Sequence, residues 1–252
     1  MNDLLLTSYF SKKKHPQYLD PDCYGVCDDG RVKQSDFSYI EKWYHSVDSL
    51  KLNAVIFYDN LTPEFIALHE TDKIKFVEVE SSKYTNNDWR FFCYRQYLEE
   101  NPCETVFLSD CSDVVVIKDP RQLLNEYPDY NFFACKDIVK LSQYQYGAAS
   151  FPKIIKAAGW AGKDFFEENG DKLDLINMGI LGGKYEDMMD FLNLFVAMRS
   201  RYPDEIFNMN MALGQFLLRY ALKDRPSLIG DPVTSIYKGH EDDRKDVFFI
   251  HK

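Results

Sequence analysis

Two aspartates lie where a strongly apolar segment ends, a place where paired carboxylates can bind a metal ion. Asp110 and Asp113 follow the run TVFLS and precede a second apolar run, VVVI. Carboxylates that leave a strand in one turn can direct their oxygens at one cation, and Mg²⁺ or Mn²⁺ is usually held by few carboxylates plus substrate phosphates. Aspartate is also common in turns for local hydrogen-bonding reasons. The spacing alone therefore supports a metal site and a capped turn about equally.

Two further segments combine small residues with polar side chains. In NMGILGG, Gly179 lets the backbone approach a ligand closely, and the Asn177 amide can both donate and accept hydrogen bonds. In FFIHK, the His251 imidazole can ligate Mn²⁺, and Lys252 can neutralise a diphosphate. Each segment has an ordinary alternative when taken alone, namely a strand that ends in a Gly-Gly turn and an exposed tail.

The elements that must position these residues alternate along the chain. Apolar runs predict strands over residues 4–10, 53–58, 73–79, 105–109, 175–183 and 246–252. Apolar spacings of three and four predict helices over residues 37–49, 151–158, 185–201 and 208–220. Asn87 or Asp88 is expected to cap another helix, which runs through WRFFCYRQYLEEN.

This alternation predicts an α/β fold with a mostly parallel sheet that is covered on both faces. Ligands of such sheets bind beyond the carboxyl ends of the strands. The loops after Phe10, Tyr58 and Ser109 should therefore meet at one edge of the sheet.

Composition narrows the class of protein. The length of 252 residues favours one domain over residues 1–252. The formal net charge of −10 argues against unspecific binding to nucleic acid or anionic membranes, because both require a positively charged surface. No apolar run approaches the roughly 18 residues of a transmembrane segment. The first residues lack the basic region of a signal peptide, and six cysteines are spread widely along the chain. A cytoplasmic location is the expectation.

These features, in this order, resemble the GT-A class of nucleotide-sugar glycosyltransferases. SDCSDVVVIKDP looks like the DxxD variant of the acidic motif in the glycosyltransferase domains of collagen lysyl hydroxylases, NMGILGG like the segment beside the donor sugar, and FIHK like the closing histidine. The resemblance implies a Rossmann-like three-layer α/β/α sandwich with a mixed, mostly parallel sheet. It also implies that Asp110, Asp113 and His251 bind Mn²⁺ or Mg²⁺. The resemblance covers nearly the whole chain. Whether the chain is one part of a longer enzyme stays open.

The resemblance further implies roles for residues around a UDP-sugar. Thr7, Ser8 and Tyr9 would seat the base and ribose, and Arg90 and Lys252 would contact the nucleotide or its diphosphate. Asn177 and Gly179 would position the sugar.

Asp174 is a candidate for contacting the sugar hydroxyls, and a solvated loop acid is the equally supported alternative. The late helix begins FNMNMALGQ, where related enzymes often carry an acidic residue, so it provides no donor-sugar carboxylate.

The acceptor, a glycan or another hydroxyl compound, is expected over residues 136–171. Tyr144, Tyr146, Phe151 and Trp160 can stack on a sugar ring there, although core positions are as well supported for most of them. The DxxD variant and the closing His-Lys pair resemble retaining members of the class more than inverting ones.

Two other functions stay open. A nucleotidyltransferase that makes nucleotide sugars uses a similar sheet and metal, but its first loop is usually glycine-rich, whereas TSYFSKKKHPQ contains no glycine. A non-catalytic carbohydrate-binding module would retain the sheet without the chemistry, and the intact set of Asp110, Asp113 and His251 disfavours it. Release of UDP distinguishes an enzyme from a binding module.

Overall fold

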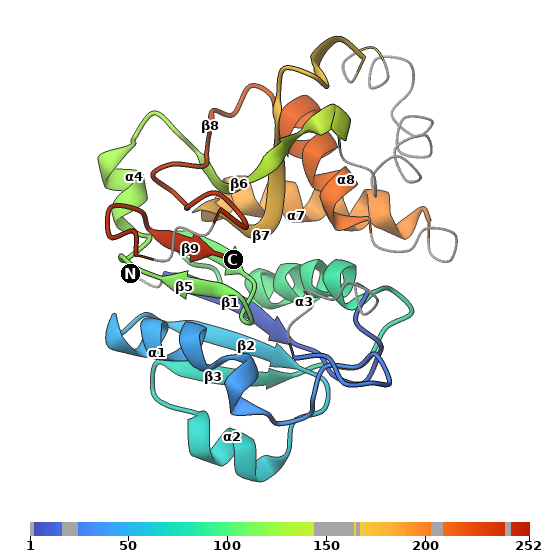
Figure 1. The fold of residues 1–252 in the computed structure, drawn as a ribbon, viewed down its shortest axis with the longest axis vertical. Helices are drawn as coiled ribbons and strands as arrows, with labels where there is room; N and C mark the ends of the chain where they lie inside the picture. The colour runs from blue at the N-terminus through green and yellow to red at the C-terminus, as the bar shows by residue number, and fades with distance from the viewer. Residues whose placement is uncertain (1–2, 17–24, 144–163, 165–166, 203–208, 240–242) are drawn as a thin grey trace.

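A seven-stranded sheet forms the centre of the molecule (Figure 1). The computed structural model describes residues 3–16, 25–143, 164, 167–202, 209–239 and 243–252. The strands, in spatial order, are β3 (Ile74–Glu78), β2 (Ala54–Tyr58), β1 (Leu4–Tyr9), β4 (Thr105–Ser109), β7 (Asp174–Lys184), β6 (Phe132–Lys140) and β8 (Ser227–Ile229). Only β7 pairs antiparallel with its neighbours, so the prediction of a mixed, mostly parallel sheet is confirmed. The carboxyl ends of β1, β2 and β4 share one edge, as expected.

Helices cover both faces of this sheet. On one face, sheet residues such as Leu6 pack with Phe91 of α3 (Asn86–Glu100) and Phe191 of α7 (Tyr185–Ser200), and α8 (Asn210–Phe216) completes that layer. On the other face, Leu5 packs with Trp43 of α1 (Glu41–Ser49) and Phe65 of α2 (Pro63–His69). Adjacent residues of a strand point to opposite faces, so the two apolar clusters form a three-layer α/β/α sandwich.

Helix boundaries differ from the predictions for local reasons. The N-cap of α3 is Thr85 and not Asn87 or Asp88, because the Asp88 carboxylate is turned inward to Arg199 and the Met209 amide. The helix predicted over 37–49 is divided into a 3₁₀ turn, η1 (Phe37–Tyr39), and α1.

Two other predicted helices are compared with the structure next. The one expected over 208–220 ends as a π-helical turn, η3 (Leu217–Ala221). The one expected over 151–158 lies outside the described residues.

Several elements were not predicted as a helix or strand from the sequence, although the apolar run VVVI covers one of them. They are α2, β5 (Val114–Val116), α4 (Gln122–Glu126), β6, a 3₁₀ turn η2 (Leu141–Gln143) and β8. The last strand, β9 (Phe249–His251), is shorter than the predicted 246–252 and does not join the main sheet. It pairs antiparallel with β5 in a separate two-stranded sheet, with His251 opposite Val114 (Figure 1).

Strand β7 contains an irregularity in its middle. Its pairing with β4 is regular through Ser109 and Ile180. Its pairing with β6 shifts, because Ala134 faces Leu181 whereas the next residue, Cys135, faces Asn177. Residues 178–180 therefore have no partner on β6. Bulges of this kind redirect side chains and are frequent beside active sites.

Within the described ranges, no helix combines the length and the apolar composition that crossing a bilayer requires.

Candidate metal and substrate site

Three predicted ligands converge at the carboxyl end of β4. Asp110 and Asp113 follow that strand, and β9 brings in His251. The His251 Nε2 atom lies 3.5 Å from Asp113 Oδ2 and 4.0 Å from Asp110 Oδ2. One ligand atom from each residue falls within 4.8 Å of the others. The structure thus brings together residues that are distant in the sequence.

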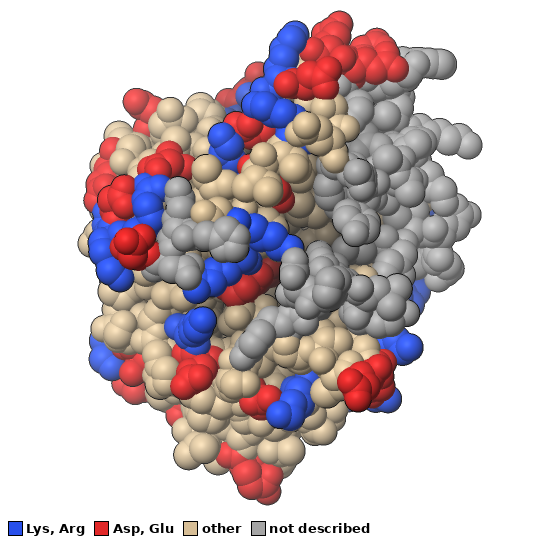
Figure 2. Space-filling view, viewed as in Figure 1, with Lys and Arg blue, Asp and Glu red and all other residues tan. Residues whose placement is uncertain are grey.

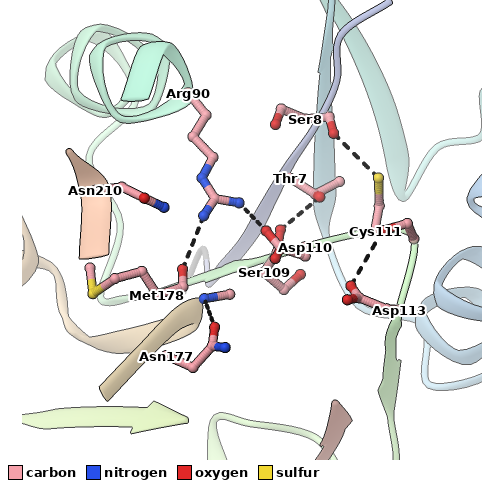
Figure 3. Close-up of polar contacts among 12 residues, drawn as sticks. Thr7, Ser8, Arg90, Ser109, Asp110, Cys111, Asp113, Asn177, Met178 and Asn210 are labelled. Carbon is pink, nitrogen blue, oxygen red and sulfur yellow. Dashed lines mark hydrogen bonds and ion pairs between the residues drawn. The ribbon is translucent and has the colours of Figure 1, made fainter. Parts of the chain in front are cut away.

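The Asp110 carboxylate is divided between two neighbours. Its Oδ1 pairs with the Arg90 guanidinium (Figure 3), and its Oδ2 faces His251. Arg90 also donates to the Met178 carbonyl at 3.2 Å, and the Asp110 amide donates to the Gly179 carbonyl at 2.7 Å. Arg90 therefore anchors one oxygen of Asp110 and leaves the other for a cation.

The bulge of β7 supplies the space for this arrangement. A Cβ atom at Gly179 would lie 2.7 Å from Asp110 Oδ2 and 2.9 Å from His251 Nε2, closer than real Cβ contacts come. Glycine is thus required by close approach. Gly179 was expected to let the backbone approach a ligand, whereas in this structure it approaches the predicted metal ligands Asp110 and His251.

Charge interactions set the ionisation of the three groups. Burial raises the pKa of Asp110 above its ordinary value, and the Arg90 charge opposes this shift. Burial acts in the same direction on Asp113, but His251 and the Ser112 hydroxyl outweigh it and lower the pKa of Asp113. Burial alone would lower the pKa of His251, whereas Asp113 and Cys135 raise it well above the ordinary value. Without metal, His251 is consequently a cation beside ionised Asp113.

The donor set fits a hard divalent cation. Two carboxylates and one imidazole suit Mn²⁺, and Mg²⁺ is compatible with the carboxylate oxygens. The side chains of Asp110 and Asp113 are 30% and 28% exposed, whereas that of His251 is 1% exposed. A cation held here would keep positions open toward solvent, where substrate oxygens can bind. On the face drawn in Figure 2, acidic atoms lie in a hollow near the middle, next to basic side chains.

The expected nucleotide residues of β1 mostly face inward. The Thr7 hydroxyl is fully buried and donates to the Ser109 carbonyl at 2.7 Å. Tyr9 is also fully buried, and its hydroxyl donates to the Lys33 carbonyl at 2.5 Å. Ser8 is half-buried, and its carbonyl accepts from the Cys111 thiol (Figure 3). Of the three, only Ser8 has a side chain that is partly exposed.

The expected sugar-side residues are separated along β7. Asn177 is buried, and its Oδ1 accepts from the Gly179 amide at 2.8 Å. Asp174 begins the strand and forms ion pairs with Lys136 at 2.8 Å and Lys140 at 2.6 Å, which lower its pKa. At about 3.3 Å per residue, Asp174 lies roughly 10 Å along the strand from Asn177.

The remaining predicted residues lie at the margin of the site or beyond it. Lys252 has an exposed side chain, and its amide donates to the Asp113 carbonyl at 3.0 Å. The aromatic residues expected on the acceptor side lie outside the described residues; they are Tyr144, Tyr146, Phe151 and Trp160.

Two groups near the cluster were not selected from the sequence. His15, in the loop after β1, is half-buried, and burial together with the Arg90 charge lowers its pKa to about 4. Asp137 of β6 interacts with Asn177 and His251, and burial raises its pKa. A lone histidine in a polar loop and an aspartate in an unpredicted strand gave no pattern to detect. Only the pairing of β6 with β7 places Asp137 here.

Solved structures share this fold across the chain. The galactosyltransferase LgtC in complex with donor and acceptor sugar analogues matches with a TM-score of 0.52 at 12% identity, covering 98% of this chain and 86% of that one. An active-site mutant of LgtC matches with a TM-score of 0.51 at 13% identity, covering 99% and 86%. A glycosyltransferase involved in glycosylation of the major capsid of PBCV-1 matches with a TM-score of 0.49 at 15% identity, covering 100% and 92%.

These similarities define the fold class. The chain has the α/β, Rossmann-like GT-A fold that its motifs resemble, and the LgtC structures share it. No protein-family model and no curated protein matches the sequence. Because one fold can host unrelated functions, the function of this chain has to be inferred from the chemistry of its site.

Proposed function

We propose that this chain is a divalent-metal-dependent glycosyltransferase that moves a sugar from a UDP-sugar to a hydroxyl group of a glycan or another acceptor. The observation that carries the proposal is the convergence of Asp110, Asp113 and His251 at the carboxyl end of β4. The fold shared with LgtC supports it. That match covers 98% of the chain, which also supports one catalytic domain over residues 1–252.

In this proposal, Asp110, Asp113 and His251 hold Mn²⁺ or Mg²⁺. The cation supplies Lewis-acid stabilisation of the negative charge that develops on a leaving diphosphate. Arg90 orients Asp110 through its ion pair and opposes the rise in the pKa of Asp110 that burial causes. Lys252 has an exposed side chain whose position beside Asp113 allows it to approach the diphosphate.

The sugar is assigned to the space beside the β7 bulge. Asn177 is tied to Gly179 and interacts with Asp137, so the amide and that carboxylate form one polar wall. Retention of anomeric configuration is part of the proposal and rests on the resemblance of the acidic motif and closing histidine. The anomeric configuration of the product, read by proton NMR, tests it. An inverted product would make Asp137 the first described carboxylate to examine as a general base.

The first experiment is thermal unfolding of the purified chain with UDP, GDP, CMP or dTDP, each with and without Mn²⁺. A ligand that binds only the native state raises the melting temperature. We expect a shift with UDP that requires Mn²⁺, followed by UDP release in a screen of UDP-sugars and simple acceptors. Absence of a shift with every nucleotide would favour the carbohydrate-binding module.

A nucleotidyltransferase is the second enzymatic candidate. Its test is release of pyrophosphate from UTP and a sugar phosphate. The absence of glycine from residues 7–17, which span the end of the predicted first strand and the start of the loop after it, disfavours it, because no glycine there lets the backbone wrap a triphosphate.

A further inference from the structure

We propose that Cys135 is a positioning residue for the metal site. Its thiol accepts a hydrogen bond from His251 Nδ1–H and thereby holds the imidazole with Nε2 directed at the two aspartates. The inference rests on the proposed metal site and extends it to a residue that touches neither metal nor substrate.

The two side chains are in direct contact in the interior. Cys135 Sγ lies 3.3 Å from His251 Nδ1, and the two residues are 116 positions apart in the sequence. Cys135 is fully buried, and His251 is 2% exposed. No water competes for Nδ1 in such a place, so the thiol decides which hydrogen-bonding state this nitrogen adopts.

The direction of the hydrogen bond follows from a second contact of the thiol. The Cys135 S–H can donate to the Lys136 carbonyl, 3.6 Å from Sγ. With its proton used there, the sulfur presents lone pairs to Nδ1 and requires Nδ1 to carry a proton. The reverse arrangement would place the proton of a neutral imidazole on Nε2, where it would point at Asp113 and block a cation.

The surrounding backbone holds the imidazole in this orientation. The His251 amide donates to Ser235 Oγ at 3.1 Å, and the Tyr237 ring centre lies 4.4 Å from the imidazole centre. On the remaining side, Gly179 approaches the ring through the β7 bulge. Rotation of the ring by half a turn about the Cβ–Cγ bond would put carbon atoms where Nδ1 and Nε2 now lie, so the thiol at Nδ1 and Asp113 at Nε2 favour the same orientation.

Cys135 is not itself a ligand in this arrangement. Its sulfur contacts Nδ1, whereas the carboxylates face Nε2 on the opposite side of the ring. The thiol therefore acts through His251. Residues that orient metal-binding histidines commonly contribute about 10- to 100-fold to metal affinity.

The test compares Cys135→Ser, which keeps a hydroxyl donor and acceptor, with Cys135→Val, which keeps an apolar side chain of similar size. A role in packing alone predicts that valine is tolerated better than serine. The positioning role predicts the opposite order. Mn²⁺ affinity is measured by electron paramagnetic resonance, with and without UDP, and thermal unfolding confirms the native fold. Cys93→Ala, at another buried cysteine, is the matched control.

We expect Cys135→Ser and Cys93→Ala to bind Mn²⁺ within about threefold of the unmodified chain, and Cys135→Val to bind about 10- to 100-fold more weakly. Equal affinities for the serine and valine variants, or tighter binding by valine, would overturn the role of Cys135 and leave the metal site intact. An unmodified chain that binds no Mn²⁺, with or without UDP, would overturn the proposed function and this inference together.

Discussion

Two buried acidic sites in this molecule use the same residue type for opposite purposes. Asp88 is fully buried and paired with Arg199, which is 1% exposed. Its Oδ2 lies 2.7 Å from Arg199 Nε, and both oxygens lie 3.0 Å from the Met209 amide. The Arg199 guanidinium also lies over the Tyr84 ring. Every oxygen of this carboxylate has a protein partner.

The cluster at the end of β4 is incomplete by comparison. Asp110 has Arg90 on one oxygen, and its other oxygen faces Asp113 and His251 across gaps that no protein donor closes within hydrogen-bond distance in the described ranges. Both aspartate side chains there retain more than a quarter of their exposure. The comparison teaches that a saturated carboxylate serves to join helices, whereas an unsaturated and partly exposed pair can hold a ligand.

The largest effect is expected from disrupting the saturated site, the ion pair of Asp88 with Arg199. Arg199→Met should lower the free energy of unfolding by about 3–5 kcal/mol, because it leaves the Asp88 carboxylate buried without its charge partner. Chemical denaturation measures this loss. Glu99→Gln, which removes an exposed ion pair with Arg95, is the control and should cost less than about 1 kcal/mol. A loss as small as that of the control would contradict the structural role of the pair.

The next largest effect is expected from disrupting the unsaturated site at Asp110 and Asp113. Asp113→Ala should reduce Mn²⁺-dependent UDP release by at least about 100-fold, because the cation contributes several kcal/mol to transition-state stabilisation. Circular dichroism should confirm that the variant stays folded, because Asp113→Ala also removes the charge partner of buried His251. Asp129→Ala, at an exposed acid, is the control. If UDP release keeps the same Mn²⁺ dependence in both Asp113→Ala and Asp110→Ala, the two aspartates are not metal ligands.

The pH dependence sharpens the comparison, because only the unsaturated site exchanges a proton for a metal. The pKa of His251 is raised in the folded chain, so a cation must displace its proton. Apparent Mn²⁺ affinity should rise with pH by up to about tenfold per unit for one displaced proton, and it should level off only above the raised pKa of His251. Titrations at several pH values measure this slope, and His251→Ala should flatten it.

Stability of the metal-free chain should follow the opposite sign. A raised histidine pKa contributes stability that is fully present below the unfolded value near 6.5, and it is lost as pH rises through the folded value. Mn²⁺ should therefore stabilise the chain most at the alkaline end of this range. Denaturation with and without Mn²⁺ at pH 6 and pH 8 gives the comparison, and a metal effect that shrinks with rising pH would contradict it.

The smallest effect concerns an acid of intermediate character. Asp174 is about one-third exposed and bonded to Lys136 and Lys140. Asp174→Asn should change the free energy of unfolding by less than about 1 kcal/mol and leave Mn²⁺ affinity unaltered. If Asp174 contacts the donor sugar, as the sequence predicts, the KM for the UDP-sugar will rise while Mn²⁺ binding stays constant. An unchanged KM would leave it a surface ion-pair residue.

Much of the first half of the fold could be predicted because its signals are local. The buried runs of β1, β2 and β4 are continuous and apolar, as strands covered on both faces require. The predicted boundaries of β1 and β2 differ from the observed ones by a single residue at one end. The predicted N-cap of α3 was wrong, because the Asp88 side chain points inward to Arg199, a residue distant in the sequence.

The site could be predicted only in part for the same reason. The resemblance to GT-A enzymes indicated Asp110, Asp113 and His251 as one group, which residue type and spacing alone left open, and the structure brings the three together. The register between β5 and β9, which places His251 beside Asp113, depends on three-residue strands that leave no periodic pattern. Asp137 escaped detection because the segment of β6 around it, KDIVK, is mixed in polarity and half-exposed. Local sequence thus identifies ligand types, while their neighbours follow from long-range pairing.

The pairing of β9 with β5 also has a consequence for how the chain folds. The site does not exist until residues near the end of the chain return to a strand in its middle, so a partly folded chain lacks the third ligand however well its first strands are formed. Mn²⁺ binding should therefore report completion of folding and not its beginning. At a free concentration about 100 times its dissociation constant, the metal would stabilise the complete fold by about 2.7 kcal/mol.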